Sequence, residues 1–280
     1  MSSPRVSVVV PTYNNGPFIE ATMESILAQT FTDFELLVSD HESTDDTWER
    51  LRRFAYDPRV TLWQTPHGGG APANWQAVTD RATGEFVKLV CGDDLIYPTC
   101  LSDQVAAMDA HPGVALVSGR RDLIDAQGAV LPGGRGTARL RGLTSGRDAL
   151  KRTVRAGTNI FGEPATVLLR TAILQDVGGW WGEFPYVIDE ATYALVLLQG
   201  DAYAVDRSIA AFRVSDGQWS VDLASQQAAQ VIAFHDALAT MAPDLVTKAD
   251  LRRGAVMAKA LGHARRLVYL AMRRRMSTAE

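Results

Sequence analysis

The stretch Val6-Ser7-Val8-Val9-Val10-Pro11-Thr12-Tyr13-Asn14-Asn15 decides the fold of this chain. Its β-branched start predicts a short buried strand over residues 5–10, which Pro11 ends. The polar residues from Pro11 to Asn14 then follow the carboxyl end of that strand. This position matters because open parallel sheets bind their ligands at the carboxyl ends of the strands.

The next eighty residues alternate between strand and helix patterns. Strands are predicted at 34–38, 60–63 and 85–90, and helices at 18–29, 45–54 and 71–82. Asp45 and Asp46 open the second of these helices, where the helix dipole favours acidic residues, and we expect them to act mainly as caps. The alternation predicts an α/β fold with a mainly parallel, Rossmann-like sheet and helices on both faces.

The rest of the chain is less regular. Further strands are predicted at 165–169, 202–205 and 209–214, and a helix at 189–198. The segment 131–146 is rich in Gly and Arg and predicts a mobile loop. Every pattern after Ser220 is helical, so we expect a helical C-terminal tail.

The composition is that of a globular protein, with 280 residues, 46% of them hydrophobic and 21% charged. The formal net charge of −4 argues against a nucleic-acid partner, since proteins that bind nucleic acids are usually basic. Cys91 and Cys100 match no zinc spacing and suit a reducing compartment. No apolar run is long enough for a signal peptide or a membrane span, so we expect a soluble cytoplasmic protein.

Polar or acidic residues follow three of the predicted strands. They are Pro11 to Asn14, then Asp40, then Cys91-Gly92-Asp93-Asp94. The residues from Pro11 to Asn14 do not match the glycine fingerprint of dinucleotide-binding folds. Gly68-Gly69-Gly70 is not a P-loop, because it lacks the Lys and the Ser or Thr that complete one. Adjacent carboxylates repel each other, and a divalent cation shared with phosphates is the usual compensation.

In their order and spacing, these motifs resemble those of family 2 glycosyltransferases. The residues that carry the resemblance are Val8 to Asn14, Val38-Ser39-Asp40 with Ser43 to Thr47, and Gly84 to Val87 leading to Asp93-Asp94 and Pro98. The resemblance is close over residues 5–100 and looser over 159–220. It implies a GT-A fold and sugar transfer, with inversion, from a nucleotide-diphospho-sugar. It also implies one catalytic domain over 1–220, divided into a nucleotide-sugar half (1–118) and an acceptor half (119–220), and a helical extension over 221–280.

The resemblance assigns roles to the residues at the strand ends. Tyr13 would lie near the base, Asp40 would accept hydrogen bonds from it, and Asp93 would hold Mg²⁺ or Mn²⁺. The full set implied for the donor is Pro11, Thr12, Tyr13, Asn14, Asp40, Asn74, Asp93 and Asp94. On the donor side, two positions depart from the family pattern. Ala73 replaces a common Arg, and Cys91 replaces an Asp, although a thiol is a poor ligand for a hard ion.

An inverting transfer also needs a carboxylate that takes the proton from the acceptor hydroxyl. In relatives this base lies about ten residues before a Gly-Asp turn, here Gln199-Gly200-Asp201, which implies Asp189 and leaves Glu190 as the alternative. Glu163 is implied at the entry of the acceptor strand. Trp180 and Trp181 either pack in the core or form a stacking platform for the acceptor. The implied donor is a UDP- or dTDP-sugar, and the acceptor is a hydroxyl on a glycan, a lipid-linked glycan or a small natural product.

The C-terminal tail is strongly basic. From Lys248 to Arg275 there are nine Lys and Arg residues and one acid, Asp250. One predicted helical face carries Lys259, His263, Arg266 and Arg273, and another carries Leu261, Ala264, Val268 and Ala271. The tail is therefore either a solvated helix that packs on the core or a basic amphipathic helix that contacts an anionic membrane surface.

Two other classes of function stay open. A metal-dependent nucleotidyltransferase would also be an α/β protein rich in carboxylates, but the loop after the first strand is neither glycine-rich nor basic. A non-catalytic sugar-nucleotide binder is favoured by Ala73, by Cys91 and by Ser215, which stands where relatives often have His.

Overall fold

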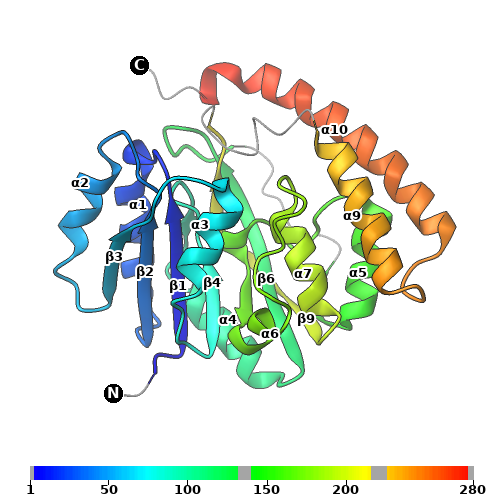
Figure 1. Cartoon of the computed structure of the whole chain (residues 1–280), viewed down its shortest axis with the longest axis horizontal. Helices are drawn as coiled ribbons and strands as arrows, with labels where there is room; N and C mark the ends of the chain where they lie inside the picture. The colour runs from blue at the N-terminus through cyan, green and yellow to red at the C-terminus, as the bar shows by residue number, and fades with distance from the viewer. Residues whose placement is uncertain (1–2, 132–139, 216–225, 277–280) are drawn as a thin grey trace.

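The computed structural model describes residues 3–131, 140–215 and 226–276 (Figure 1). In these residues, nine strands form one sheet in the order β3-β2-β1-β4-β8-β6-β9-β5, with β7 paired to β9. The strands are β1 (Val6–Thr12), β2 (Phe34–Asp40), β3 (Val60–Gln64), β4 (Phe86–Leu89), β5 (Leu95–Ile96), β6 (Val114–Ile124), β7 (Gly142–Thr144), β8 (Leu168–Arg170) and β9 (Asp201–Arg213). The helices are α1 (Gly16–Leu27), α2 (Thr47–Leu51), α3 (Gly70–Thr79), α4 (Cys100–Ala110), α5 (Gly146–Ala156), α6 (Thr171–Asp176), α7 (Ile188–Leu197), α9 (Gln227–Met241) and α10 (Lys248–Met276), with 3-10 turns η1 (Arg52–Phe54) and η2 (Pro164–Thr166).

The longest strand pairings are parallel. β1 lies between β2 and β4, β3 lies outside β2, and β6 runs parallel to β9. The short strand β8 joins the two groups and is antiparallel to both β4 and β6. The chain adds β2 and β3 on one side of β1 and then places β4 on its other side, so the strand order reverses at β1. The crevice at the carboxyl end of β1 is therefore the expected ligand site. The predicted architecture, a mainly parallel sheet with helices on both faces, is confirmed.

Alternate residues of the central strands face two hydrophobic cores. On β1, Val9 belongs to the core that includes residues of α3, α5 and α7, whereas Val8 and Val10 belong to the core that includes residues of α1 and α4. Figure 1 shows α3 and α7 on the near side of the sheet and α1 and α4 behind it. Burial on both faces explains why Val8, Val9 and Val10 are apolar in succession rather than alternating with polar residues.

β1 continues through Pro11, at which the sequence analysis ended it. Pro11 is paired with Ser39 on β2, but on the other side the pairing with β4 stops at Val9 and Leu89. The missing N–H of Pro11 therefore breaks no ladder on that side. The extension places Thr12 at the end of the strand.

The middle of the chain differs most from the prediction. β6, α4 and α5 were not predicted, and the expected strand at 165–169 begins as the 3-10 turn η2 before β8. The two strands expected at 202–205 and 209–214 are one strand, β9, whose exposed polar residues Asp206 and Arg207 interrupt the apolar pattern beside register shifts in β6. Of the Gly- and Arg-rich segment, 132–139 lies outside the described residues and 142–144 forms β7.

The C-terminal helices pack on the body of the protein. Val231, Phe234 and Leu238 of α9 belong to the same core as residues of α7. Gly254 of α10 lies so close to α5 that a Cβ there would be 2.1 Å from the carbonyl oxygen of Val154. The buried face of α10 thus includes small residues, whereas Ala264, which we expected on the apolar face, is exposed. The division of residues 1–220 into two halves, followed by an extension, stays a prediction. The predicted boundary between the halves, residue 118, lies inside strand β6.

No helix in the described ranges has the length and apolar character needed to cross a membrane.

Candidate active site

The loop after β1 is ordered by its own side chains. Thr12 is buried, and its hydroxyl donates a hydrogen bond of 2.8 Å to Asn15 Oδ1. Asn14 has a left-handed backbone (φ 52°), which asparagine tolerates better than most residues. Its Oδ1 accepts from the N–H of Thr44 (2.8 Å), and its own N–H donates to Ser43 Oγ (2.9 Å). These bonds tie the loops after β1 and β2 together at the carboxyl edge of the sheet.

Tyr13 presents its ring at the surface, with 42% of the residue exposed. The centre of the ring lies 5.0 Å from that of His67 and 6.4 Å from that of His41, and the two imidazoles are 5.2 Å apart. The buried His41 accepts a hydrogen bond at Nε2 from the N–H of Gly68 (3.1 Å). These three rings form an aromatic cluster where the sequence predicts the nucleoside pocket, although no sequence pattern pointed to the two histidines.

Asp40 ends β2 and is fully buried. Its Oδ2 accepts from Gln64 Nε2 (2.9 Å) on β3, and its Oδ1 accepts from the N–H (3.3 Å) and the hydroxyl of Ser43. A carboxylate has about four lone-pair sites, so acceptor capacity remains for a ligand. Recognition of a base by Asp40 stays a prediction, and the structure adds that Asp40 also orders the loop after β2.

Asn74 reaches the loop after β1 from α3. It is 4% exposed, and its Nδ2 donates to the carbonyl oxygen of Thr12 (3.2 Å). Its Oδ1 is buried and has no hydrogen-bond partner among the described residues. A buried acceptor without a partner is destabilising, and a donor group on a ligand would satisfy it. This setting is compatible with the predicted place of Asn74 beside the nucleotide.

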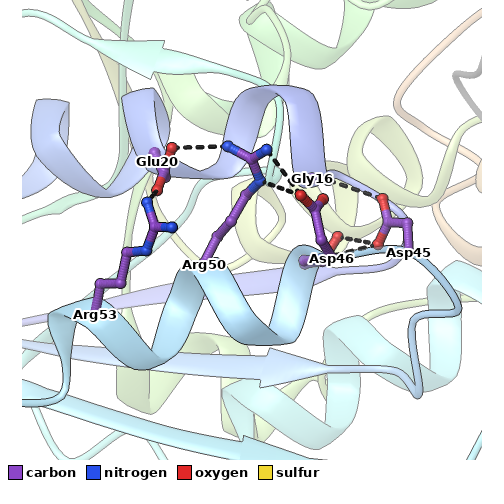
Figure 2. A network of polar contacts seen from close by, with 7 residues as sticks. Gly16, Glu20, Asp45, Asp46, Arg50 and Arg53 are labelled. Carbon is purple, nitrogen blue, oxygen red and sulfur yellow. Dashed lines mark hydrogen bonds and ion pairs between the residues drawn. The ribbon is translucent and has the colours of Figure 1, made fainter.

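Asp45 has the capping role that the sequence favoured, whereas Asp46 precedes α2 without a side-chain cap hydrogen bond and forms an ion pair instead. Asp45 accepts at Oδ2 from the N–H of Gly16 (3.0 Å), at the start of α1, and at Oδ1 from the N–H of Thr47 (3.0 Å), at the start of α2. Asp46 forms an ion pair with Arg50 (2.7 Å), and Arg50 forms a second ion pair with Glu20 of α1 (2.9 Å). Figure 2 shows this network joining the two helices. The network therefore holds α1 and α2 in place beside the loops that follow β1 and β2.

The acidic turn after β4 packs directly against the loop after β1. A Cβ on Gly92 would lie 2.6 Å from Asn15 Oδ1 and 2.7 Å from Thr12 Oγ1, so the two loops can approach this closely only at a glycine. From α1, the hydroxyl of Thr22 donates to the carbonyl oxygens of Gly92 (3.1 Å) and Asp94 (2.9 Å). The turn is thus fixed from two sides.

Asp93 and Asp94 are both buried, with 8% and 0% exposure. Asp94 Oδ1 accepts from the backbone N–H of Arg213 (3.0 Å), whereas Oδ2 has no hydrogen-bond partner in the part of the chain that is described. Burial, followed by the charge of Asp93, raises the pKa of Asp94 well above its usual range. A cation near this pair would lower that pKa again.

The described residues contain no group of three His, Cys, Asp or Glu side chains that could hold a metal by themselves. Burial, followed by the charges of Asp94 and Asp93, raises the pKa of the Cys91 thiol well above its usual value. A protonated thiol does not bind a hard cation. A cation at this turn would therefore need oxygen ligands from a bound molecule, such as phosphate oxygens, in addition to the carboxylates of Asp93 and Asp94.

Arg213, at the end of β9, holds the acidic turn from the far side. Its Nε donates to the carbonyl oxygen of Asp93 (2.9 Å), and one terminal nitrogen donates to those of Asp125 (3.1 Å) and Ala126 (3.2 Å). The guanidinium lies 4.6 Å from the centre of the Phe18 ring. The side chain thus joins the turn after β4 to the end of β6.

Asp189 lies in the first turn of α7 and is partly exposed. Its Oδ2 accepts from Asn159 Nδ2 (2.8 Å), and its Oδ1 accepts from the N–H of Glu190 (2.7 Å). Desolvation by the surrounding protein raises the pKa of Asp189 to about 7, the charges of Glu190 and Glu163 add to the rise, and the two hydrogen bonds oppose it. A carboxyl group that titrates near pH 7 is suited to general-base catalysis.

Glu190 is enclosed, unlike its neighbour. It is 1% exposed, and its Oε1 lies 3.2 Å from His235 Nε2 on α9, a residue that is itself 2% exposed. Of the two carboxylates that the sequence left as candidates for the base, only Asp189 has surface that an acceptor can reach.

Glu163 and Asp189 belong to a group of acids around Cys91, because both charges contribute to the raised pKa of that thiol. Glu163 forms an ion pair with Arg121 of β6, and an Arg121 terminal nitrogen donates to Glu163 Oε1 (2.5 Å).

Tyr193, four residues after Asp189 on α7, is fully buried, and its hydroxyl has no hydrogen-bond partner within the described ranges.

Trp180 and Trp181 have different settings. Trp180 is 7% exposed, its Nε1 donates to Thr79 Oγ1 (2.8 Å), and its ring lies 5.1 Å from that of Trp75. Trp181 is partly exposed, and its backbone N–H donates to Thr192 Oγ1 (2.9 Å). Trp180 therefore packs in the core, and Trp181 is the one with surface to offer an acceptor.

The structure brings the predicted residues to two neighbouring places at one edge of the sheet. Around the ends of β1 and β2 lie Thr12, Tyr13, Asn14, Asp40 and Asn74, and around Cys91 lie Asp93, Asp94, Glu163 and Asp189. The sequence analysis assigned no role to Asn159, Arg121 or His235. Each acts through a residue at least 30 positions away, a distance at which no local pattern gives a signal.

Comparison with known families identifies the chain. The family model described as glycosyl transferase family 2 matches residues 7–176, which is more than half of the sequence. The chain belongs to this family. The match confirms the resemblance that the motifs carried, and it extends beyond residue 100, where the motif pattern was loose.

Two curated relatives are glycosyltransferases by name. The UDP-Glc:alpha-D-GlcNAc-diphosphoundecaprenol beta-1,3-glucosyltransferase WfaP of Escherichia coli is 31% identical over 106 residues, 38% of this chain and 42% of that protein. The poly(ribitol-phosphate) beta-N-acetylglucosaminyltransferase TarS of Staphylococcus aureus is 37% identical over 112 residues, 38% of this chain and 19% of that protein. The match thus spans less than half the length of either relative.

Solved structures show the same fold. S. aureus TarS 1–349 in complex with UDP-GlcNAc has a TM-score of 0.70 at 21% identity, over 92% of this family 2 chain and 71% of that chain. The mannosyltransferase PcManGT from Pyrobaculum calidifontis, in complex with GDP-Man and Mn²⁺, has a TM-score of 0.63 at 19% identity, over 96% and 81%. At these identities the likeness shows the GT-A-like fold alone.

Proposed function

We propose that this family 2 glycosyltransferase moves a sugar, with inversion, from a nucleoside-diphosphate sugar to a hydroxyl acceptor, and that Asp189 is the catalytic base. The observation that carries the proposal is the setting of Asp189, which is partly exposed and oriented through both carboxylate oxygens, and whose burial raises its pKa to about 7. The acceptor oxygen attacks the anomeric carbon, the bond from that carbon to the diphosphate oxygen breaks, and the hydroxyl proton passes to Asp189.

The donor is proposed to bind along the carboxyl ends of β1, β2 and β4. Thr12 and Tyr13 would line the nucleoside, and the unpaired Oδ1 of Asn74 would accept from the nucleotide. A uracil or thymine ring carries one N–H, which a carboxylate such as Asp40 can accept. This supports a UDP- or dTDP-sugar, and UDP-Glc in the name of the E. coli relative agrees with it.

Mg²⁺ or Mn²⁺ is proposed to be held by Asp93 together with the donor diphosphate. The unpaired oxygen of Asp94 and its raised pKa support a cation at this turn. When bound, such an ion neutralises the negative charge of the leaving diphosphate. Ala73 offers no positive charge for that purpose, which makes the ion more important here.

The acceptor is proposed to approach between Trp181, Glu163 and Asp189. Its class stays broad: a glycan, a lipid-linked glycan or a small natural product with a free hydroxyl. The names of the two relatives include a lipid diphosphate and a polyol phosphate polymer, and both would be worth testing.

The test is a donor panel with and without Mn²⁺, in which nucleoside diphosphate and pyrophosphate are measured separately. We expect nucleoside diphosphate to be released with at least one UDP- or dTDP-sugar. Release of pyrophosphate would favour a nucleotidyltransferase instead. Donor binding without release, across the panel and with all acceptor classes, would favour a non-catalytic binder.

Contact with a membrane surface through α10 is a further part of the proposal. Exposed Arg252, Val256, Lys259, His263 and Arg266 recur every three or four residues and so share one face of the helix. This supports weak binding to anionic vesicles that falls as salt rises. Equal sedimentation with neutral and anionic vesicles, or none with either, would leave α10 as a packing helix.

A further inference from the structure

We propose that His235, on α9, is a positioning residue for this transfer. Through its contact with Glu190 it holds the first turn of α7, and thereby the direction in which Asp189 faces the acceptor. The inference rests on the proposed role of Asp189 as the base. It makes the C-terminal helices part of the catalytic apparatus.

The orientation of Asp189 depends on the backbone of Glu190. One carboxylate oxygen of Asp189 accepts from the Glu190 N–H at 2.7 Å, so any shift of that turn moves the base. The N-cap residue of α7, Val187, supplies no side-chain hydrogen bond. The first turn therefore relies on contacts from outside the helix to stay in place.

The Glu190 side chain provides such a contact. Its carboxylate is almost fully buried, and a buried carboxylate is stable only with a hydrogen-bond or ion-pair partner. His235 Nε2 lies 3.2 Å from Glu190 Oε1 and is equally buried. The pair thus links α7 to α9 at the residue next to the base.

α9 also contacts the segment that leads into α7. Gln230 Oε1 accepts from the backbone N–H of Tyr186 (2.7 Å). One helical turn later, the Phe234 ring lies 6.1 Å from that of Trp181 and 5.9 Å from that of Phe184. Figure 1 shows α9 next to α7. Residues 230, 234 and 235 therefore hold the acceptor side of the site from 181 to 190.

The first experiment compares His235→Leu, which removes the contact and keeps an apolar side chain, with His235→Gln, which keeps an N–H donor. His111→Leu is the matched control, because His111 lies at the end of α4, where its ring stacks on that of Tyr203 on β9 (5.0 Å), and it has no role at the proposed site. A misplacement of about 1 Å can slow a reaction by roughly 10²-fold. We expect His235→Leu to lower kcat by about 10- to 100-fold with unchanged UDP affinity, and His235→Gln to recover most of the loss.

The second experiment measures amide hydrogen exchange in the same full-length proteins. Exchange should speed up in residues 188–192 of His235→Leu and stay unchanged in residues 8–12 and in the control. Identical exchange at 188–192, wild-type kcat in His235→Leu, or an equal loss of UDP affinity would each overturn the inference. A wild-type protein that transfers no sugar would instead contradict the proposed function, and the exchange data would still report whether the contact holds the turn.

Discussion

Asn159 Nδ2 donates a hydrogen bond of 2.8 Å to Asp189 Oδ2 from a loop 30 residues earlier in the chain. The same amide nitrogen donates to the carbonyl oxygen of Gly162 (3.0 Å), and its Oδ1 accepts from the N–H of Phe161 (2.8 Å). Asn159 thus orders the entry of the acceptor segment and directs one N–H at the proposed base. That N–H opposes the rise in the pKa of Asp189 that burial causes.

Replacing Asn159 by Ala should therefore move the pH profile. Asp189 accepts a proton only when ionised, so kcat/KM of the wild type should fall as pH decreases through about 7. The variant lacks a hydrogen bond that favours the ionised form, so the acidic limb should move to higher pH. A limb that stays in place or moves to lower pH, in a variant with wild-type UDP affinity, would contradict this role.

Asp189→Asn should abolish most turnover and leave donor binding intact. The amide keeps the size of the side chain but cannot take the proton, and removal of a general base typically costs about 10²–10⁴ in rate. The comparison is kcat against UDP affinity by calorimetry, with Glu190→Gln expected to be milder. An inactive Glu190→Gln beside an active Asp189→Asn would reverse the two assignments.

The free energy of unfolding should also depend on pH, because the pKa of Asp189 is raised in the folded protein. The pKa of Asp189 is about 7 in the folded chain and about 4 in an unfolded one, so the folded state binds this proton more tightly. Its contribution to the free energy of unfolding therefore falls as pH rises from 4 to 7 and is constant above 7. Asp189→Asn lacks this term, so its stability relative to wild type should rise over the same interval. Denaturant titrations at pH 5 and pH 8 check the sign, and an equal difference at both pH values would refute it.

Gly92→Ala should weaken donor binding. The new methyl group would meet Asn15 Oδ1 at 2.6 Å and Thr12 Oγ1 at 2.7 Å, which forces the acidic turn away from the loop after β1. Gly113→Ala is the matched control, because its nearest heavy atom would be 3.9 Å away. We expect UDP affinity to fall by roughly tenfold or more in the first variant only, since each 1.4 kcal/mol lost corresponds to a factor of ten. Equal affinities in both variants would show that this close approach is not needed for the donor.

Asp93→Ala should remove the effect of Mn²⁺ on donor binding. A single carboxylate shared with a diphosphate is a minimal cation site, and the other acid of the turn, Asp94, is fully buried and already accepts a hydrogen bond from the backbone of Arg213. UDP titrations with Mn²⁺ and with EDTA should differ for the wild type and coincide for the variant. The metal assignment fails if both proteins respond to Mn²⁺ alike.

The sequence predicted the part of the fold in which local patterns are strong. The apolar run of β1, its helix and the alternation that follows are determined by side-chain periodicity within short windows, and they were found with boundaries close to those observed. The sequence analysis missed β6 and divided β9 into two strands. In both strands polar residues lie beside register shifts, where the strand continues although its apolar pattern stops. Hydrogen bonds between strands maintain such a segment, and they leave no periodic signal in one strand alone.

The same distinction applies to the site. By itself the sequence determined which residues follow the strand ends, and so which carboxylates gather at one edge of the sheet. Only the tertiary structure decided what each can do: it enclosed Glu190 against His235, left Asp189 partly exposed beside Asn159, and surrounded Cys91 with acids. The reason is physical. The ionisation and reach of a carboxyl group depend on its burial and on the charges and donors around it, and those neighbours come from residues far away in the chain.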